Sequence, residues 1–490
     1  MTNWIRTKNN GLLKTAEIPL LQSDILVSET AKECREKKRP VAFFGAEEAD
    51  NIRLFVVLAD DARSELLVSS CAFAKGSKYQ SLTGKVPSLH MFEREFFEQC
   101  GIRPEGHPWL KPLRKGEEKE YPFFKMEGEE LHEVAVGPVH AGIIEPGHFR
   151  FTCHGEKIYH LELKHGYQHR GVEELFIKND KPSHCLAESI AGDTVLGHSI
   201  AYSNAYEALS GIQITRKAQI IREIALELER MAVHIGDLGA IANDIAYQMG
   251  SAVFGVTRTL AINTMLDICG SRSGRGLVRP GGVLFDIDNV LAGRISVSLD
   301  KVVEDTERAA KTMFSTSSVL LRLEKTGIVK KEKALELGLV GMTARASGIN
   351  LDIRNDHPWG NYTELPVKCG HPEGGDAFAR TYIRYAEVKK SAELVRMLLE
   401  KMKTVKEEAL NIPFNDLSPD RFVVSMVEGW RGEIVHAALT DGNGKLRRYK
   451  IKDPSFNNWI ALALAVRGAG ISDFPLCNKS FDLSYCGNDL

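Results

Sequence analysis

The strongest constraint on the fold of this chain is a long run of apolar residues with helical spacing in its centre. In "ITRKAQIIREIALELERMAVHIGDLGAIANDIAYQMG", residues 214–250, apolar side chains recur every three to four positions and charged ones collect on the other face. The same pattern marks residues 172–210, 252–270, 289–325 and 376–408. Several long helices in series predict a helix bundle.

Strand patterns precede the bundle. "RPVAFFGAEE", "IRLFVVLADD" and "SELLVSSCAF" are short apolar runs bounded by turn residues, and Phe92, Phe96 and Phe97 fit a short amphipathic helix. We expect residues 1–115 to form a small α/β domain and the charged, aperiodic residues 112–130 to be a linker.

Residues 131–490 are expected to form a second domain with β-rich ends around the bundle. Alternating residues punctuated by Gly and Pro follow residue 131, and "VVSMVEGWRGEIVHAALTDGNGKLRRYKIKD" predicts a hairpin with "DGNG" as its turn. The predicted fold class is α+β.

Composition narrows the function. The 490 residues carry a net charge of −2, which gives no general attraction for nucleic acid or an anionic membrane. No sequence run approaches the ~18 apolar residues of a spanning helix. The N-terminus lacks a signal-peptide pattern. We therefore expect a cytosolic protein whose membrane association goes through partners. The nine cysteines form no C-x-x-C pair, which argues against disulfides and against a self-contained zinc or iron–sulfur site.

Two loop motifs carry candidate functional residues. "GPVHAGIIEPGHFRF" gathers His140, Glu145 and His148 among Gly and Pro; such loops often line sites, although composition alone favours a polar turn with surface histidines. "HGYQHRGVEELF" places Arg170 and Glu173 at a helix start, where an ordinary helix terminus explains them equally well.

Three further motifs are weak by themselves. "ERMAVHIGDLGAIANDIA" puts Glu229, His234 and Asp244 on one helix; a buried Asp244 would need a partner such as a histidine, whereas a solvated face would need none. "EGWRGEIVH" places Arg431 after a Trp, as an ion-pair anchor or above a redox site. "GSRSGRGLVRPGG" could hold an anionic group or a partner's carboxylates, through the arginines Arg272, Arg275 and Arg279.

In their order along the chain, these segments resemble the catalytic large subunit of energy-converting, formate hydrogenlyase-type [NiFe] hydrogenases and the corresponding subunit of respiratory complex I. "FEREFFEQCGIRPEGHP" resembles the small complex I subunit that packs beside it, here fused to it. The resemblance implies a [NiFe]-hydrogenase-like large-subunit fold with a central helix bundle.

The hydrogenases of this family hold nickel and iron with two C-x-x-C pairs, because soft thiolate ligands suit these metals. Aligned on "LAESIAGDTVLGHSIAY" and "DFPLCNKSFDLSYCGNDL", the four cysteine positions fall on Ala191, Thr194, Ser484 and Gly487. Cys477 and Cys486 are not the missing ligands in this register. The resemblance therefore implies that this chain binds no metal, with a shifted one-cysteine site at Cys486 as the less favoured alternative.

Complex I uses the vacated cavity for a quinone headgroup. By the same resemblance, its quinone-binding His falls near His148 and the Asp paired with it falls on Asp244, while its quinone-binding Tyr falls on Gly192. His198 and Tyr202 keep the flanking pattern, and Tyr202 or Tyr485 could replace the missing Tyr. His140 is a further candidate for the pocket.

The resemblance implies a peripheral subunit of an NADH:quinone oxidoreductase-like or hydrogenase-related complex. A small partner subunit would carry a [4Fe–4S] cluster, and antiporter-like subunits would form the membrane arm, with this chain on the cytoplasmic side of the inner membrane. Electrons would pass to a quinone that His148 hydrogen-bonds, with Asp244 orienting His148. Glu145 and Arg431 would supply charge and proton passage. The residues that would face the small subunit are Arg272, Arg275 and Arg279. The alternatives are a structural or coupling subunit without chemistry and a true hydrogenase with altered ligands.

Overall fold

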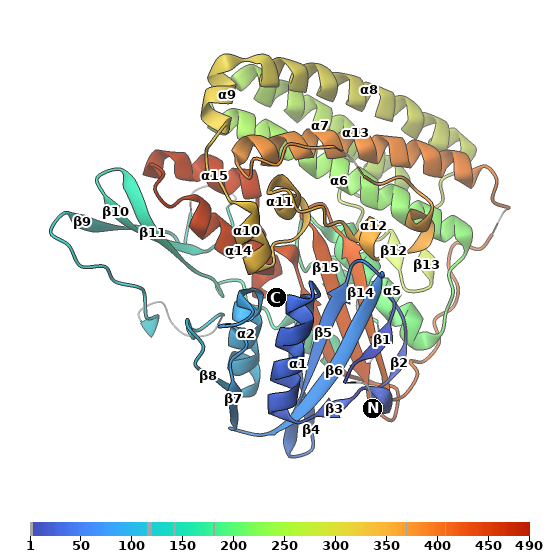
Figure 1. Cartoon of the computed structure of the whole chain (residues 1–490). Helices are drawn as coiled ribbons and strands as arrows, with labels where there is room; N and C mark the ends of the chain where they lie inside the picture. The colour runs from blue at the N-terminus through green and yellow to red at the C-terminus, as the bar shows by residue number, and fades with distance from the viewer. Residues whose placement is uncertain (1–2, 115–119, 141–143, 180–181, 369, 407) are drawn as a thin grey trace.

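The computed structural model describes residues 3–114, 120–140, 144–179, 182–368, 370–406 and 408–490. Four long helices form the predicted bundle, and Figure 1 shows them lying along one another on one side of the molecule. They are α6 (Arg216–Asp244), α7 (Gln248–Cys269), α8 (Asn289–Ser315) and α13 (Ala377–Met402).

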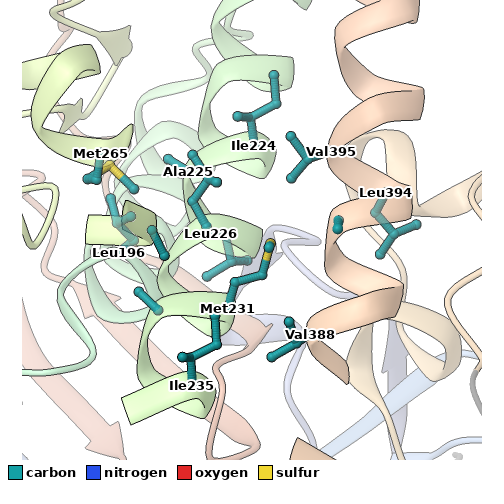
Figure 2. Packing of buried hydrophobic residues seen from close by; sticks show 14 of the residues in the cluster. Leu196, Ile224, Ala225, Leu226, Met231, Ile235, Met265, Val388, Leu394 and Val395 are labelled. Atoms are coloured by element: carbon teal, nitrogen blue, oxygen red, sulfur yellow. The ribbon is translucent and has the colours of Figure 1, made fainter. Parts of the chain in front are cut away.

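Local chemistry explains where the bundle helices begin. Thr215, Asp288 and Asp376 precede α6, α8 and α13, and each side chain accepts a hydrogen bond from a backbone N–H in the first turn. Apolar side chains of α6 and α13, among them Met231 and Val388, pack in the bundle core (Figure 2). Burial of this apolar surface holds the helices together.

Two predicted helices are wrong in their extent. The one at 289–325 is divided into α8 and α9 (Ser317–Leu323) at Thr316, whose backbone is extended. Residues 172–210 form three helices, α3 (Val172–Lys178), α4 (His184–Ala187) and α5 (Val195–Ser210), with residues 180–181 outside the described part. Pro182 lacks the N–H that a continuous helix needs, and residues 188–194 form turns before α5 begins.

The three predicted N-terminal strands are confirmed as β4 (Arg39–Glu48), β5 (Asn51–Asp60) and β6 (Glu65–Ala74). They pair antiparallel in the order β1-β6-β5-β4, where β1 is Ile5–Thr7, and β3 (Leu20–Leu21) pairs with β6. The predicted amphipathic helix is α2 (His90–Cys100); α1 (Ser23–Arg35) lies between β3 and β4 in sequence.

The C-terminal sheet has four strands, two more than the predicted hairpin. β14 (Arg421–Glu428), β15 (Glu433–Thr440) and β16 (Leu446–Lys452) pair antiparallel, with "DGNG" between β15 and β16 as predicted. The N-terminal strand β2 (Leu13–Lys14) pairs with β14. The two parts on either side of the boundary expected near residue 115 therefore share this sheet, because β2 belongs to the first part and β14 to the second.

A third sheet, β9 (Leu131–Val136), β10 (His148–His154) and β11 (Lys157–Lys164), confirms the β-rich entry to the second part. After β16, helix α14 (Pro454–Ala465) leads to α15 (Phe474–Phe481) and α16 (Tyr485–Asp489). Asp482 ends α15 with a φ of 49°, which turns the chain sharply toward α16.

The remaining elements are short connecting pieces. They are β7 (Lys78–Gln80), β8 (Arg103–Glu105), β12 (Val278–Arg279), β13 (Gly282–Val283), α9 (Ser317–Leu323), α10 (Lys331–Leu337), α11 (Gly341–Ala346), α12 (Ile353–Asp356), η1 (Thr15–Glu17), η2 (Pro87–Leu89), η4 (Gly360–Thr363) and η5 (Ile471–Asp473). Among the described residues, α7 alone is long and apolar enough to cross a membrane, and it packs between α6 and α8 in the bundle.

Candidate functional site

A cavity of about 930 Å³ opens where the third sheet, α6 and the α15–α16 segment meet. It brings together five of the predicted site residues from distant parts of the sequence. These are His140, Glu145, Asp244, Arg431 and Tyr485.

One face of α6 forms a wall of this cavity. The lining positions 233, 236, 237, 240 and 244 are spaced by three or four residues, as expected for one side of a helix. Gly236 and Ala240 are small, and Asp237 and Asp244 bring carboxyl groups to the wall. A Cβ at position 236 would lie 2.9 Å from the side chain of Arg258 on α7, so the glycine makes room for that arginine.

Arg431 joins two chain segments at the cavity. Its two Nη atoms each donate a hydrogen bond of 2.7 Å to the carboxylate of Asp193, and its Nε donates to the carbonyl oxygen of Asp482. The guanidinium also lies 3.9 Å from the ring of Trp430. Burial opposes the charge, but Asp193 and Asp482 outweigh it and raise the pKa of Arg431. Arg431 is therefore an ion-pair anchor that also lines the cavity.

Glu145 reaches across the cavity to the start of α16. Its Oε2 accepts hydrogen bonds from the backbone N–H groups of Tyr485 (3.1 Å) and Cys486 (3.3 Å). A carboxylate at this helix start is stabilised by the exposed N–H groups. Residues 141–143 of the predicted "GPVHAGIIEPGHFRF" loop lie outside the described residues.

The predicted pairing of His148 with Asp244 is not formed. The buried His148 ring has its Nδ1 3.3 Å from the Gly137 carbonyl oxygen and packs against Phe123, and His148 is not among the residues lining the cavity. Asp244 is largely exposed at the end of α6, where Lys479 is its attractive neighbour. Partial burial raises the pKa of Asp244, and Lys479 opposes that rise. Spacing along the sequence did not reveal that β10 turns His148 away from this helix end.

His198 and Tyr202, predicted to contact substrate, are buried in the core instead. His198 lies 3.1 Å from both His436 Nε2 and Asp453 Oδ2, and His436 Nδ1 lies 2.7 Å from the Tyr449 hydroxyl. Tyr202 accepts a hydrogen bond from the Ser183 N–H. Neither side chain lines the cavity, because α5 directs this face toward the C-terminal sheet.

The four positions aligned with metal-ligand cysteines carry no thiol, and one of them is filled by a neighbour. Ala191 and Thr194 are fully buried, and Ser484 caps α16 through a 2.9 Å hydrogen bond from the Gly487 N–H. A Cβ at Gly487 would lie 2.6 Å from Asp453 Cγ. No real Cβ contact is that short, so a cysteine at 487 would require the Asp453 side chain to move.

The two cysteines of the C-terminal stretch are poor candidates for ligands. Burial, with help from Glu145, raises the pKa of Cys486 to about 12, and burial raises that of Cys477 to about 11. Both thiols therefore stay protonated near neutral pH, whereas a metal binds the thiolate. Cys369 lies outside the described residues.

Four charged residues of the cavity were missed by sequence reasoning: Asp193, Asp237, Arg258 and Lys479. Asp237 had a usable signal, because it precedes Asp244 by seven residues and so shares its helical face. Arg258 and Lys479 had none, since only the packing of α7 and α15 against α6 brings them to the site.

Sequence profiles connect both parts of the chain to respiratory enzymes. The profile of the respiratory-chain NADH dehydrogenase 49-kDa subunit matches residues 244–489, and that of the 30-kDa subunit matches residues 20–127. The chain belongs to the 49-kDa subunit family. It carries the 30-kDa-type domain fused at its N-terminus.

Relatives of the 49-kDa family support this assignment. The chain is 29% identical over 454 residues to formate hydrogenlyase subunit 5 of Escherichia coli (strain K12), covering 85% of this chain and 78% of that protein. It is 29% identical over 359 residues to an NADH-quinone oxidoreductase subunit of Clostridium beijerinckii (strain ATCC 51743 / NCIMB 8052), covering 72% of this chain and 96% of that protein.

The fold is also that of a solved respiratory protein. A chain from the membrane-bound sulfane sulfur reductase (MBS), described as an archaeal respiratory membrane complex, superposes with a TM-score of 0.68 over 74% of this chain and 99% of that one, at 22% identity. This match shows the fold alone.

The residues of this 49-kDa family member do not fit a nickel–iron centre. Such a centre needs thiolates, and the corresponding positions offer a methyl group, two hydroxyls and a hydrogen atom. Among the described residues, no group of three or more His, Cys, Asp or Glu side chains is placed to hold a metal ion. The lack of metal in the functional protein stays a prediction.

The three arginines in the loop after α7 differ in whether they have a partner within the chain. Arg279 Nη1 lies 3.1 Å from Glu188, which anchors it within the chain, while Arg272 and Arg275 are exposed. Arg272 and Arg275 are thus available to a partner, and the contact itself stays a prediction.

Proposed function

We propose that this chain is a subunit of a membrane-bound complex related to complex I and the energy-converting hydrogenases, and that its cavity is where an acceptor is reduced. A small partner subunit with a [4Fe–4S] cluster would supply electrons, antiporter-like subunits would form the membrane arm, and the chain would sit peripherally on the cytoplasmic side. The acceptor we propose is a quinone. The supporting observation is the 930 Å³ cavity, which gathers carboxyl, guanidinium and phenol groups without a thiolate set.

The cavity chemistry suits a quinone headgroup, which is flat and apolar with two hydrogen-bonding oxygens. Phe149, Phe151 and Phe474 supply apolar walls, and Tyr485 and His140 supply polar groups. Gly192 is exposed, and a Cβ there would meet no atom within 4 Å. Gly192 is not among the residues that line the cavity, so this open space lies outside the proposed acceptor site.

The residue roles follow the geometry. Tyr485 and His140 are proposed to contact the acceptor, and Arg431 holds the Asp193 and Asp482 segments that shape the cavity. Glu145, at the start of α16, connects the cavity to the backbone of the C-terminal segment and is proposed to assist proton passage. His148 would act on the acceptor only indirectly, since it lies behind the lining.

The test uses the complex purified through a tag on this chain. We expect iron and acid-labile sulfide from a partner, no stoichiometric nickel, and reduction of a water-soluble quinone by the reduced complex. Tyr485→Phe should slow that reduction by roughly 100-fold or more, because it removes a hydrogen-bond donor to the acceptor. Asp300→Asn, at an exposed pair with Arg396, is the control. Stoichiometric nickel with hydrogen evolution would contradict the proposal.

A second candidate function is a structural or coupling subunit without chemistry. The observation favouring it is that the Asp453 carboxyl occupies the space beside Gly487, one of the positions aligned with a metal-ligand cysteine. It predicts that Tyr485→Phe leaves electron transfer unchanged, while variants at Arg272 and Arg275 release the partner subunit.

A further inference from the structure

Two carboxyl groups meet on the wall of the cavity. Asp237 on α6 and Asp482 at the end of α15 both line it, and they lie close enough for each carboxyl group to shift the pKa of the other. Two ionised carboxylates at such close range repel each other, and neither of them offers a hydrogen-bond donor. A proton shared by the pair removes both costs.

The surrounding cations decide which partner carries the proton. Lys479 Nζ lies 3.1 Å from Asp482 Oδ1, and Arg431 Nη2 lies 3.8 Å from Asp482 Oδ2. Asp237 is bonded directly to one cation, Arg384, whose Nε donates a 2.8 Å hydrogen bond to Oδ2, while Lys479 acts on Asp237 without a hydrogen bond. Asp237 is also the more buried of the two, so the neutral form is favoured there.

The pKa directions agree with this assignment. Burial and the neighbouring Asp482 raise the pKa of Asp237 to about 8. Burial alone would raise the pKa of Asp482 as well, but Lys479 and Arg431 outweigh it and lower that pKa to about 2. The other charged residues of the cavity are Glu145, Asp193, Asp244 and Arg258.

A separate observation indicates that a polar molecule belongs here. The Tyr485 hydroxyl is more than nine-tenths buried on the same cavity and makes no hydrogen bond of standard geometry among the described residues, although Asn478 lies close enough to affect its pKa. A buried hydroxyl without a well-formed partner costs free energy. A ligand oxygen in the cavity would satisfy it.

We propose that Asp237 is a proton donor to the molecule reduced in this cavity, with Asp482 as the base that holds the proton in place. This rests on the proposed function. Each electron comes from the partner's [4Fe–4S] cluster; the Asp237 O–H bond breaks, and the proton bonds to the acceptor oxygen made basic by reduction. Asp237 is left as a carboxylate beside Arg384 and takes a new proton from water at the cavity mouth. Two such cycles supply the two electrons and two protons that convert a quinone to a quinol.

Infrared difference spectroscopy of the full chain, with the partners that co-purify, tests the proton directly. Wild-type protein should show a protonated-carboxyl band that disappears as the pH rises through about 8. Asp237→Asn should lack that band, because the amide has nearly the shape of the carboxylic acid but carries no acidic proton. Glu229, a second buried carboxyl with a raised pKa, provides the matched comparison: Glu229→Gln should remove a different band. Asp300→Asn should remove neither.

The proposal is overturned if Asp237→Asn keeps every carboxyl band of the wild type. If Asp237→Asn does not fold, Asp482→Asn is the second variant. It changes the hydrogen-bond acceptor of Asp237, so the carboxyl band should shift, and a band that does not move overturns the pairing.

Kinetics separate this inference from the proposed function. If the wild type reduces no quinone but the band is lost in Asp237→Asn, the proposed function fails and the shared proton stands. If Asp237→Asn reduces quinone with the rate and pH profile of the wild type, the donor role is overturned.

Discussion

At the scale of single residues, two glycines at or beside the positions aligned with metal-ligand cysteines differ in what their neighbours allow. The space beside Gly487 is occupied by the Asp453 carboxyl, which is itself held by His198 and by the Ser455 N–H. Gly192, one residue from Ala191, faces open space. A side chain would therefore fit at Gly192 but would collide with Asp453 at Gly487.

Gly487→Ala should destabilise the protein by about 1–3 kcal/mol, because the new Cβ displaces a fully buried, hydrogen-bonded carboxyl. Chemical denaturation measures the change. Gly192→Ala is the matched control and should stay within about 0.5 kcal/mol of the wild type. Equal stability of the two variants would show that Asp453 moves freely and that the ligand position is open.

At the scale of elements, a buried carboxyl joins the two central helices of the large part. Glu229 on α6 accepts hydrogen bonds from the backbone N–H groups of Leu196 (2.7 Å) and Gly197 (3.2 Å) in the first turn of α5. These N–H groups have no partner within their own helix. Burial nevertheless dominates and raises the pKa of Glu229 to about 8.

The raised pKa predicts a pH dependence of stability. Between pH 4.5 and about 8 the folded protein holds this proton while the unfolded chain releases it, so the free energy of unfolding contributed by Glu229 falls as the pH rises. Glu229→Gln cannot ionise and should therefore be less destabilised relative to wild type at pH 8 than at pH 5. Denaturation at both pH values measures this. A larger deficit at pH 8 would mean that Glu229 is ionised in the folded state.

At the scale of the whole molecule, the two sequence families form one folded body. Phe44 and Phe55 of the N-terminal sheet stack on Phe422 of β14, and Arg39 forms a 2.6 Å ion pair with the buried Glu433. Together with the β2–β14 pairing, these contacts bury apolar surface that neither part covers by itself.

A chain divided between residues 114 and 120 should consequently stay together. Co-expressed fragments 1–114 and 120–490 are expected to co-elute on size exclusion, and fragment 120–490 expressed by itself should aggregate, because the β14–β15 face would be exposed. Arg39→Met in the small fragment should weaken the association, since it leaves the Glu433 carboxylate buried with only Lys452 beside it. Fragments that elute separately and stay soluble would contradict a shared core.

Local pattern was sufficient for much of this structure. The bundle helices, the three N-terminal strands, α2 and the "DGNG" turn follow from periodicity and turn residues, which depend on neighbours in sequence. The broken helix at 172–210 and the β14–β15 turn were missed because a proline and a tertiary pairing override the apolar pattern there.

In the candidate site, too, some features follow from the sequence and others only from the fold. The sequence by itself determined which side chains are present: no thiol stands at 191, 194, 484 or 487, and carboxyl, arginine and tyrosine residues are present in the surrounding motifs. Only the tertiary structure decided which of them meet. It turned His148, His198 and Tyr202 away from the cavity, filled position 487 with Asp453, and brought Asp237 against Asp482 across 245 residues. The physical reason is that side-chain identity is local, whereas burial and the charges that set a proton's position come from segments that only folding brings into contact.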